Sequence, residues 1–190
     1  MITKANKKLL RVATLAALFS FLPLSSGQAS VDALGGSVIQ ATPYDRKISA
    51  AGGFSLDAVP AISSLRSSDG LFVQARSMRY VSDAATRDYW QTPQETQARW
   101  SGDCEDKALW LFAQLKKNSH ENVRLVVGRH RSTDKNYHVW VTMADGQNNI
   151  WILDPTAQKK IWKSSDFGGG YYKPLYSFDG INRYRHDAQQ

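Results

Sequence analysis

Apolar residues recur at helical spacing in the first half of the chain and alternate with polar residues in the second half. Between residues 70 and 88, one face of a 3.6-residue repeat collects Leu71, Phe72, Ala75, Met78 and Val81. A second such face follows Cys104, and it collects Ala108, Leu109, Leu111, Phe112 and Leu115. Each pattern predicts an amphipathic helix.

A shorter helix is expected between these two. Thr92 precedes Pro93, and Glu95 stands three residues after Thr92. This is the order of a capping box with proline at the first helical position. The short helix would lead the chain through Trp100 to the turn before Cys104.

Alternation with a period of two then predicts three β-strands, over residues 123–128, 138–143 and 149–154. Asp145-Gly146 marks a hairpin turn, with extra polar residues that indicate a loop longer than two. Residues 129–136 are expected to form a charged loop. The tail around Gly168–Gly170 is expected to add an edge strand or a mobile loop that forms a substrate groove or lid. Helices followed by an antiparallel sheet predict one α+β domain over residues 66–190, after an irregular lead-in with a short helix over 30–65.

The first 29 residues have the organisation of a bacterial secretory signal peptide. A basic start is followed by an apolar run from Val12 to Leu24 and then by small residues, so cleavage is expected after Ala29. No later segment approaches the roughly 20 apolar residues that a membrane span needs. We therefore expect a periplasmic protein with no stable membrane insertion after cleavage.

Removal of this segment changes the charge of the chain. The segment carries four basic residues and no acidic one, so the formal net charge of +7 falls to +3. That value is ordinary for a folded domain and gives no indication of nucleic-acid binding. The remaining chain of about 160 residues is long enough for one domain with its own core.

Cys104 is the only cysteine of the chain and opens its helix. Asp103 is placed to cap that helix, with Asp106 three residues later, and a helix N-terminus favours a thiolate. The alternative is a small buried hydrophobic residue. Because an unpaired thiol in an exported protein is prone to oxidation, its presence favours a chemical role.

A cysteine nucleophile needs a base and a third group that orients the base. His138 opens the second strand and Asp154 closes the third. A turn centred near residues 146 to 147 would place His138 opposite residues 154 to 155. Cys104, His138 and Asp154 then form a coherent triad.

Other assignments of these residues remain open. His120, His130 and His186 are weaker base candidates, and the two arginines beside His130 indicate a solvated loop. His138 can also be a strand-end histidine with ordinary partners, and Asp154 a turn-forming residue before proline.

Four motifs follow one another within roughly Tyr80 to Thr156: Trp90-x-Thr92-Pro93-x-Glu95, Gly102-Asp103-Cys104-Glu105-Asp106, His138 and Asp154-Pro155. In this order they resemble the motifs of the bacterial transglutaminase-like cysteine peptidases. Lys107 departs from the pattern, which more usually has an aromatic residue there. The resemblance implies a papain-like α+β fold with Cys104 as nucleophile at a helix N-terminus, His138 as base and Asp154 as orienting acid. It also implies a protein substrate, such as a surface adhesin, and an inner-membrane regulatory protein as partner.

Negative charge beside Cys104 indicates a cofactor. Like charges raise the pKa of a thiol, and a helix-dipole contribution of about 0.3–1 kcal/mol hardly offsets several carboxylates. Ca²⁺ takes carboxylate oxygens, and the resemblance implies calcium ligands at Asp103 and Glu105. The alternative assigns Asp103 to the helix cap and Glu105 to the helix dipole.

Hydrolysis of a peptide bond through a thioester is the reaction that these residues favour. The backbone N–H of Cys104 and an upstream donor would bind the oxyanion, with Trp90 the candidate by position; core packing is the alternative for Trp90. Other functions remain open: a catalytically inactive calcium- or peptide-binding module, a transglutaminase-type amide acyl transferase, and a zinc site built from Cys, His and Asp.

Overall fold

The structure is a computed structural model that describes residues 33–53, 67–84 and 86–187. These residues belong to one compact unit, and the expected signal peptide over residues 1–29 lies outside them. Among the described residues, no helix is long and apolar enough to cross a membrane.

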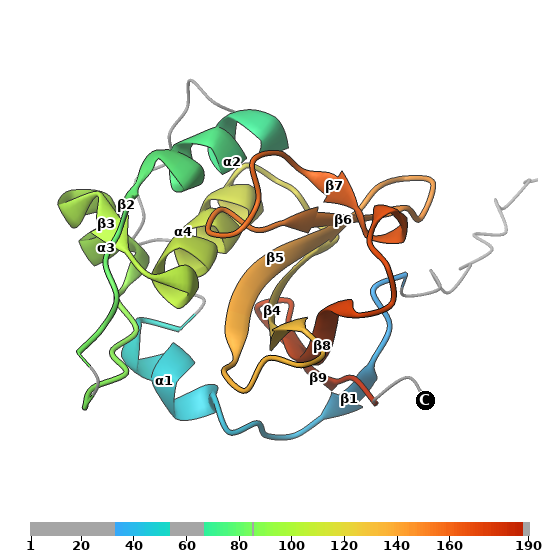
Figure 1. Cartoon of the computed structure of the whole chain (residues 1–190), viewed down its shortest axis with the longest axis horizontal. Helices are drawn as coiled ribbons and strands as arrows, with labels where there is room; N and C mark the ends of the chain where they lie inside the picture. Colours follow the sequence, from blue (N-terminus) through green and yellow to red (C-terminus); the bar gives the residue numbers. More distant parts are fainter. Residues whose placement is uncertain (1–32, 54–66, 85, 188–190) are drawn as a thin grey trace, which may run out of the picture. The chain divides into compact units, whose positions relative to one another are not determined.

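The unit is built on a seven-stranded antiparallel sheet with the order β1-β9-β8-β4-β5-β6-β7 (Figure 1). The strands are β1 (Ser37–Ile39), β4 (Val123–Arg131), β5 (His138–Ala144), β6 (Ile150–Leu153), β7 (Trp162–Lys163), β8 (Tyr171–Phe178) and β9 (Arg183–Arg185). The three predicted strands are therefore present, as β4, β5 and β6. A 3-10 turn at Ser164–Asp166 follows β7.

Helices cover one face of this sheet. They are α1 (Asp45–Ala50), α2 (Ser68–Ser77), α3 (Pro93–Arg99) and α4 (Cys104–Lys117), with a short parallel pair of β2 (Arg79–Tyr80) and β3 (Ser101–Gly102) between them. The main core lies between α4 and the sheet, where buried side chains of α4 meet Leu125, Val127, Val139, Val141 and Leu153. The alternate residues Val126, Trp140 and Ile152 form a second cluster on the opposite face.

The helix predicted between residues 70 and 88 ends earlier than expected. The backbone of Met78 is already extended, and the N–H groups of Arg79 and Val81 donate to the carbonyls of Trp100 and Gly102. Pairing with β3 therefore replaces the last helical turns. Val81, predicted on the buried face, is 43% exposed, so that part of the prediction is wrong.

The tail forms an interior strand rather than an edge strand or a loop. β8 lies between β4 and β9, and its register with β4 shifts between Val127 and Gly128. Gly128 allows this close approach, because a Cβ at that position would overlap the carbonyl oxygen of Lys173 and the indole ring of Trp140. β4 itself continues to Arg131, into the segment predicted as a charged loop.

The expected lead-in contributes to the domain. Its short helix is present as α1. The strand β1 was not predicted, and it pairs with β9 at one edge of the sheet.

Replacement of Gly128 by Ala is expected to destabilise the fold by about 3 kcal/mol, since over-packing beside backbone atoms cannot be relieved by rotating a side chain. Urea unfolding followed by circular dichroism measures this loss. Gly146→Ala is the matched control, because a Cβ at Gly146 meets nothing within 4 Å. Equal midpoints for the two variants would contradict the close approach of β4 and β8.

Candidate active site

Local structural features fix the backbone of the segment before Cys104. Thr92 and Glu95 form the predicted capping box at the start of α3. Trp100 then adopts a left-handed conformation with φ of 49° and ends α3, and β3 carries the chain into α4. The N-terminus of α4 at Cys104 is therefore fixed from both sides.

Asp106 ties this turn to the segment just before α3. Its carboxylate accepts from the backbone N–H of Gln91 at 2.7 Å, from Gln91 Nε2 at 2.6 Å and from the backbone N–H of Asp103 at 3.3 Å. A Cβ on Gly102 would lie 2.5 Å from this carboxylate, so glycine is required there. Asp106 is thus a structural residue of the site.

Cys104 lies at the first position of α4 and is half-buried. Its Sγ donates to Glu105 Oε2 at 3.0 Å. Burial raises the pKa of the thiol, and the adjacent carboxylate of Glu105 raises it further. Without a compensating positive charge, the sulfur is therefore held in its protonated form.

His138 and Asp154 are in direct contact. Nε2 of His138 lies 2.7 Å from Oδ2 of Asp154, whose side chain is fully buried. With Asp154 as acceptor, Nε2 carries the proton and Nδ1 is the basic nitrogen. Burial alone would raise the pKa of Asp154, but the bond from His138 and the N–H groups of Thr156 and Ala157 lower it overall.

The register that produces this contact differs from the predicted one. Val141 pairs with Leu153, so continuation of the ladder would set Asp154 opposite Trp140 rather than His138. The loop between β5 and β6 is longer than two residues, as predicted, and the carboxylate of Asp145 accepts the backbone N–H of Asn149 across it. His138 reaches Asp154 diagonally, because residues two apart on a strand share one face.

Tyr172 is a site residue that sequence reasoning missed. Its hydroxyl donates to Oδ2 of Asp154 at 2.9 Å and accepts from Gln158 Nε2 at 2.8 Å. Burial raises the pKa of Tyr172, and the charge of Asp154 raises it further. Tyr172 reaches Asp154 because β8 is an interior strand, and no local sequence motif predicts this contact.

His130 does not lie in a solvated loop. It belongs to β4, and its ring centroid lies 5.6 Å from that of His138 and 4.9 Å from that of Tyr172. Burial is the main cause of its lowered pKa, with a smaller contribution from Arg131. Its Nε2 is buried and has no hydrogen-bond partner among the described residues.

Trp90 is 6% exposed. Its indole N–H donates to Oδ1 of Asp88 at 3.1 Å, and its ring lies 6.1 Å from that of Tyr44. The side chain therefore contributes to packing, and its one side-chain donor is already engaged.

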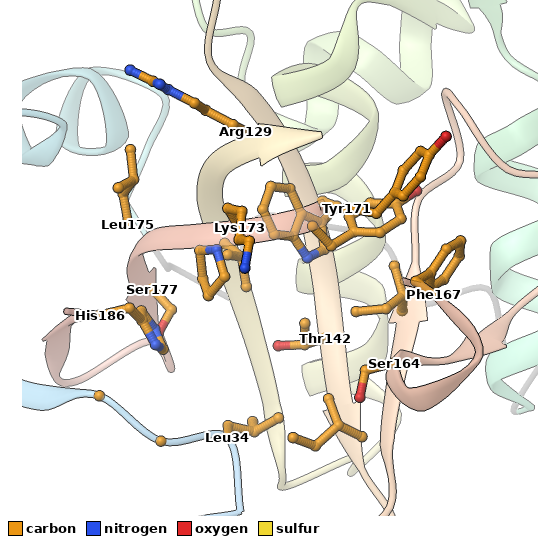
Figure 2. A pocket seen from close by; sticks show the side chains of 18 of the residues that line it. Leu34, Arg129, Thr142, Ser164, Phe167, Tyr171, Lys173, Leu175, Ser177 and His186 are labelled. Atoms are coloured by element: carbon orange, nitrogen blue, oxygen red, sulfur yellow. The ribbon is translucent and has the colours of Figure 1, made fainter. Parts of the chain in front are cut away.

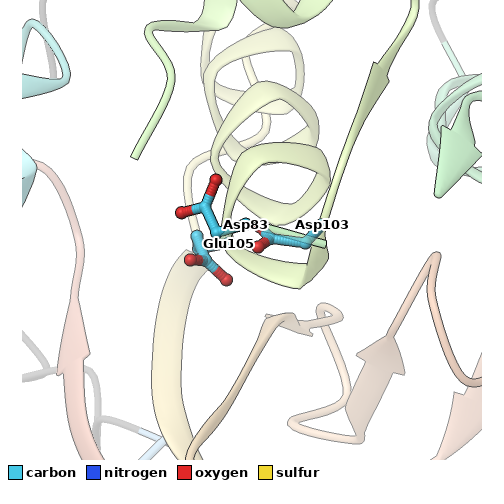
Figure 3. Close-up of side chains that lie close together, drawn as sticks. All are labelled: Asp83, Asp103 and Glu105. Carbon is cyan, nitrogen blue, oxygen red and sulfur yellow. The ribbon is translucent and has the colours of Figure 1, made fainter. Parts of the chain in front are cut away.

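A cluster of three carboxylates lies at the first turn of α4 (Figure 3). Asp83 joins Asp103 and Glu105, with one oxygen from each within 4.8 Å of the others. Burial and the charge of Asp103 raise the pKa of Glu105 to about 9. Oδ1 of Asp103 is buried and finds no hydrogen-bond partner within the described ranges of the chain. Asp83 was not predicted, because it comes from the loop after β2 and no spacing links it to Cys104.

Lys107, the departure from the motif, is 3% exposed and donates to the carbonyl oxygen of Met78 at 3.2 Å. Burial lowers the pKa of Lys107, and the negative charge of Asp154 partly offsets this decrease.

No direct bond joins the sulfur of Cys104 and the imidazole of His138 in the described part of the chain. Among the described residues, Cys104 is hydrogen bonded to Glu105 rather than to His138, and the backbone N–H of Val139, next to His138, lowers the thiol pKa. The described part of the chain groups no metal ligands around Cys104, His138 and Asp154, so a zinc site there gains no support. The triad itself stays a prediction.

Solved structures of LapG from Legionella pneumophila have a similar fold. The calcium-bound form matches with a TM-score of 0.54 at 22% identity, covering 79% of this chain and 86% of that one. The EGTA-treated form matches with a TM-score of 0.56 at 21% identity, covering 80% and 82%. No protein-family model and no curated protein matches the chain. The chain therefore has the α+β fold of LapG, with α4 beginning at Cys104 and packed on an antiparallel sheet, as the resemblance implies.

Proposed function

We propose that this protein is an exported cysteine peptidase that hydrolyses a peptide bond through Cys104, His138 and Asp154. The observation that carries the proposal is the hydrogen bond of 2.7 Å between His138 and the fully buried Asp154, together with a helix that opens with the only cysteine of the chain. A buried carboxylate that fixes one imidazole nitrogen is the arrangement that orients a general base.

The reaction follows from these groups. Nδ1 of His138 takes the thiol proton, and the sulfur of Cys104 attacks the carbonyl carbon of the scissile peptide bond. The imidazolium, stabilised by Asp154, then gives that proton to the leaving amine. Water, activated by the same imidazole, hydrolyses the thioester and releases the acid product.

Calcium fits the acidic cluster on the chemistry of its residues. Three carboxylates from Asp83, Asp103 and Glu105 converge, and Oδ1 of Asp103 is buried with no hydrogen-bond partner in the part of the chain that the structure describes. A hard cation prefers such oxygens, and the LapG structure of similar fold is calcium-bound. Bound calcium would supply positive charge beside the sulfur and so oppose the charges that raise its pKa.

The oxyanion would be bound by the backbone N–H of Cys104 at the start of α4. Trp90, the second donor proposed from sequence, would have to contribute its backbone, since its indole N–H already donates to Asp88.

The substrate is proposed to be a protein in or beyond the periplasm, with a surface adhesin and an inner-membrane regulatory protein as the partners that the family resemblance implies.

Amide transfer to an amine is the second candidate reaction, because it uses the same thioester. Mass spectrometry separates the two, since hydrolysis gives new N-termini and transfer gives cross-linked products. An inactive binding module is a further alternative, and it predicts a Cys104→Ala protein with unchanged cellular function.

The test of the proposal is the alkylation rate of Cys104 by iodoacetamide in the wild type and in His138→Ala. Loss of the base is expected to slow alkylation at pH 7 by about tenfold or more, because less thiolate forms. The matched control is His120→Ala, which removes a histidine from the loop after α4. Equal rates for wild type and His138→Ala would contradict the pairing of the thiol and the imidazole.

Removal of calcium is expected to abolish peptidase activity and to lower the melting temperature, since a ligand that binds only the folded state stabilises it. Activity and melting are measured after exhaustive chelation and again after calcium is restored. Asp83→Asn should weaken calcium binding in calorimetry, whereas Asp134→Asn, in the loop after β4, should not. Full activity and an unchanged melting temperature after chelation would rule out the site.

A further inference from the structure

Both carboxylate oxygens of Asp154 accept more than one hydrogen bond. Oδ1 accepts the backbone N–H groups of Thr156 and Ala157, each at 3.0 Å. Oδ2 accepts from Nε2 of His138 at 2.7 Å and from the hydroxyl of Tyr172 at 2.9 Å. Because the side chain of Asp154 is fully buried, bulk water cannot replace a donor that is lost. The hydroxyl of Tyr172 therefore helps to fix the carboxylate that contacts His138.

The ring of Tyr172 is held by aromatic neighbours on the sheet face opposite α4. It packs edge-on against His130, Trp140 and Phe167, with ring centroids 4.9, 5.3 and 4.8 Å away. Phe167 also lines the pocket on this face (Figure 2). Packing on several sides leaves the ring of Tyr172 little room to turn, so its hydroxyl keeps a fixed place beside Asp154.

The backbone of Tyr172 is in the left-handed region, with φ of 48°, although the residue belongs to strand β8. This conformation is unfavourable for a bulky side chain and persists where the surrounding structure requires it. Strain of this kind is typical of functional sites. It occurs here at the residue whose hydroxyl contacts Asp154, which indicates that Tyr172 does more than fill space.

The hydroxyl of Tyr172 lies between two polar partners, Asp154 and Gln158. Burial raises the pKa of Tyr172, so the hydroxyl keeps its single proton, and an ionised carboxylate can only accept. If the amide oxygen of Gln158 faced the hydroxyl, two acceptors would compete for this proton. With Nε2 of Gln158 as donor, at 2.8 Å, the proton is free for Asp154. Gln158 thus selects the direction in which the hydroxyl donates.

The turn after β6 places Gln158 for this contact. The backbone N–H of Gln158 donates to the carbonyl oxygen of Asp154 at 3.1 Å, and Oδ1 of Asp154 accepts the two N–H groups inside the same turn. The turn that binds one oxygen of Asp154 therefore also brings Gln158 to the tyrosine that binds the other oxygen.

We propose that Gln158 is a positioning residue of the active site, which orients the hydroxyl of Tyr172 and, through it, the carboxylate of Asp154. The inference rests on the proposed function, in which Asp154 orients His138, and extends it to a residue outside the triad. Hydrogen bonds in such a chain strengthen one another in a buried site. Loss of the amide donor therefore weakens the bond from Tyr172 to Asp154 without removing it.

The experiment measures kcat and KM of the exported chain, on a peptide that it cleaves, in a double-variant cycle of Gln158→Met and Tyr172→Phe. Gln158→Met is expected to lower kcat about threefold at unchanged KM, because the hydroxyl is no longer held toward Asp154. In a chain that already carries Tyr172→Phe, the same change should have no further effect. Gln147→Met, the same substitution in the exposed loop between β5 and β6, is the matched control and should leave kcat unchanged.

NMR gives a second readout that does not need cleavage. The proton on Nε2 of His138 lies in the bond to Asp154, and its signal is assigned from its absence in His138→Gln. Weaker donation by Tyr172 leaves more negative charge on Oδ2 for this proton. The signal is therefore expected to move downfield in Gln158→Met and further in Tyr172→Phe, and the double variant should match Tyr172→Phe alone.

The proposal would be overturned by effects of Gln158→Met that persist in the Tyr172→Phe chain. An unmoved His138 signal in Gln158→Met, or equal effects of Gln158→Met and Gln147→Met, would overturn it as well. If Gln158→Met melts well below the wild type, Gln158→Glu replaces it, because glutamate keeps the shape of the amide but accepts instead of donating. Its effect should exceed that of Gln147→Glu and should shrink in the Tyr172→Phe chain.

Failure of the proposed peptidase function would look different. The wild type itself would then cleave no peptide, whereas the NMR cycle would still report whether Gln158 acts on His138 through Tyr172. An active peptidase whose NMR cycle shows no coupling between Gln158 and Tyr172 would lose only the role assigned to Gln158.

Discussion

Replacement of Cys104 by Ser is expected to abolish hydrolysis, with a loss in kcat/KM of at least about 10⁴-fold. The hydroxyl keeps the geometry of the thiol, but an alcohol ionises far less readily and is the weaker nucleophile. Removal of the nucleophile from a triad costs a factor of this order or more. A peptide library identifies a cleaved sequence through its new N-termini in mass spectrometry, and kcat/KM is then measured on that peptide.

The control is the melting temperature of Cys104→Ser, which shows whether the variant still folds. Cys104 forms no disulfide, and serine differs from cysteine only by a smaller oxygen in place of the sulfur. The melting temperature of Cys104→Ser should therefore lie close to that of the wild type. Residual cleavage in a folded Cys104→Ser protein would remove the nucleophile from the proposal and leave the binding-module alternative.

Local sequence patterns were sufficient to predict the elements that flank the site. The capping box of Thr92 and Glu95 and the start of α4 at Cys104 depend on neighbouring residues, whose preferences act within one turn. The pairing of His138 with Asp154 also follows from one hairpin. Its detailed register did not, because the length of the loop between β5 and β6 depends on how the side chain of Asp145 folds it.

Residues that join the site through tertiary pairing could not be predicted in this way. Asp83 reaches the acidic cluster because β2 pairs with β3. Tyr172 reaches Asp154 because β8 inserts next to β4. Both pairings are non-local, and a period of two or 3.6 in one segment carries no information about its neighbours in a sheet.

The charged groups around Cys104 are different from those around the His138–Asp154 pair. His138 is already oriented by Asp154, whereas the thiol donates to Glu105 in a group of buried carboxylates. A change in the acidic cluster should therefore act on Cys104 and leave the His138–Asp154 bond intact. This separation predicts that, with calcium present, Asp83→Asn slows alkylation of Cys104, because it weakens binding of the cation that would oppose the carboxylate charge, and that it leaves the NMR shifts of the His138 ring unaltered.

Replacement of Asp154 by Asn is expected to lower kcat by about 10²- to 10⁴-fold with little change in KM. The amide keeps the shape of the carboxylate but cannot stabilise the imidazolium, and an Asn nitrogen facing His138 would favour the wrong tautomer. Tyr172→Phe should cause a smaller loss, of about tenfold, because it removes only one of the bonds to Oδ2 of Asp154. Steady-state kinetics on the cleaved peptide measures both effects.

The stability of Asp154→Asn provides an independent measurement. The pKa of Asp154 is lowered in the folded state, so its ionised form stabilises the protein above the ordinary pKa near 4 of an unfolded aspartate, and this contribution is lost as the pH falls through the folded-state pKa. Unfolding free energies of the variant should therefore fall less steeply than those of the wild type below about pH 4. The matched control is Asp187→Asn, because Asp187 is exposed and its ion pair with Arg185, at 3.8 Å, lies at the surface. Full activity of Asp154→Asn together with an unchanged acid profile would mean that this buried carboxylate neither orients His138 nor carries charge, and the triad would then have to be abandoned.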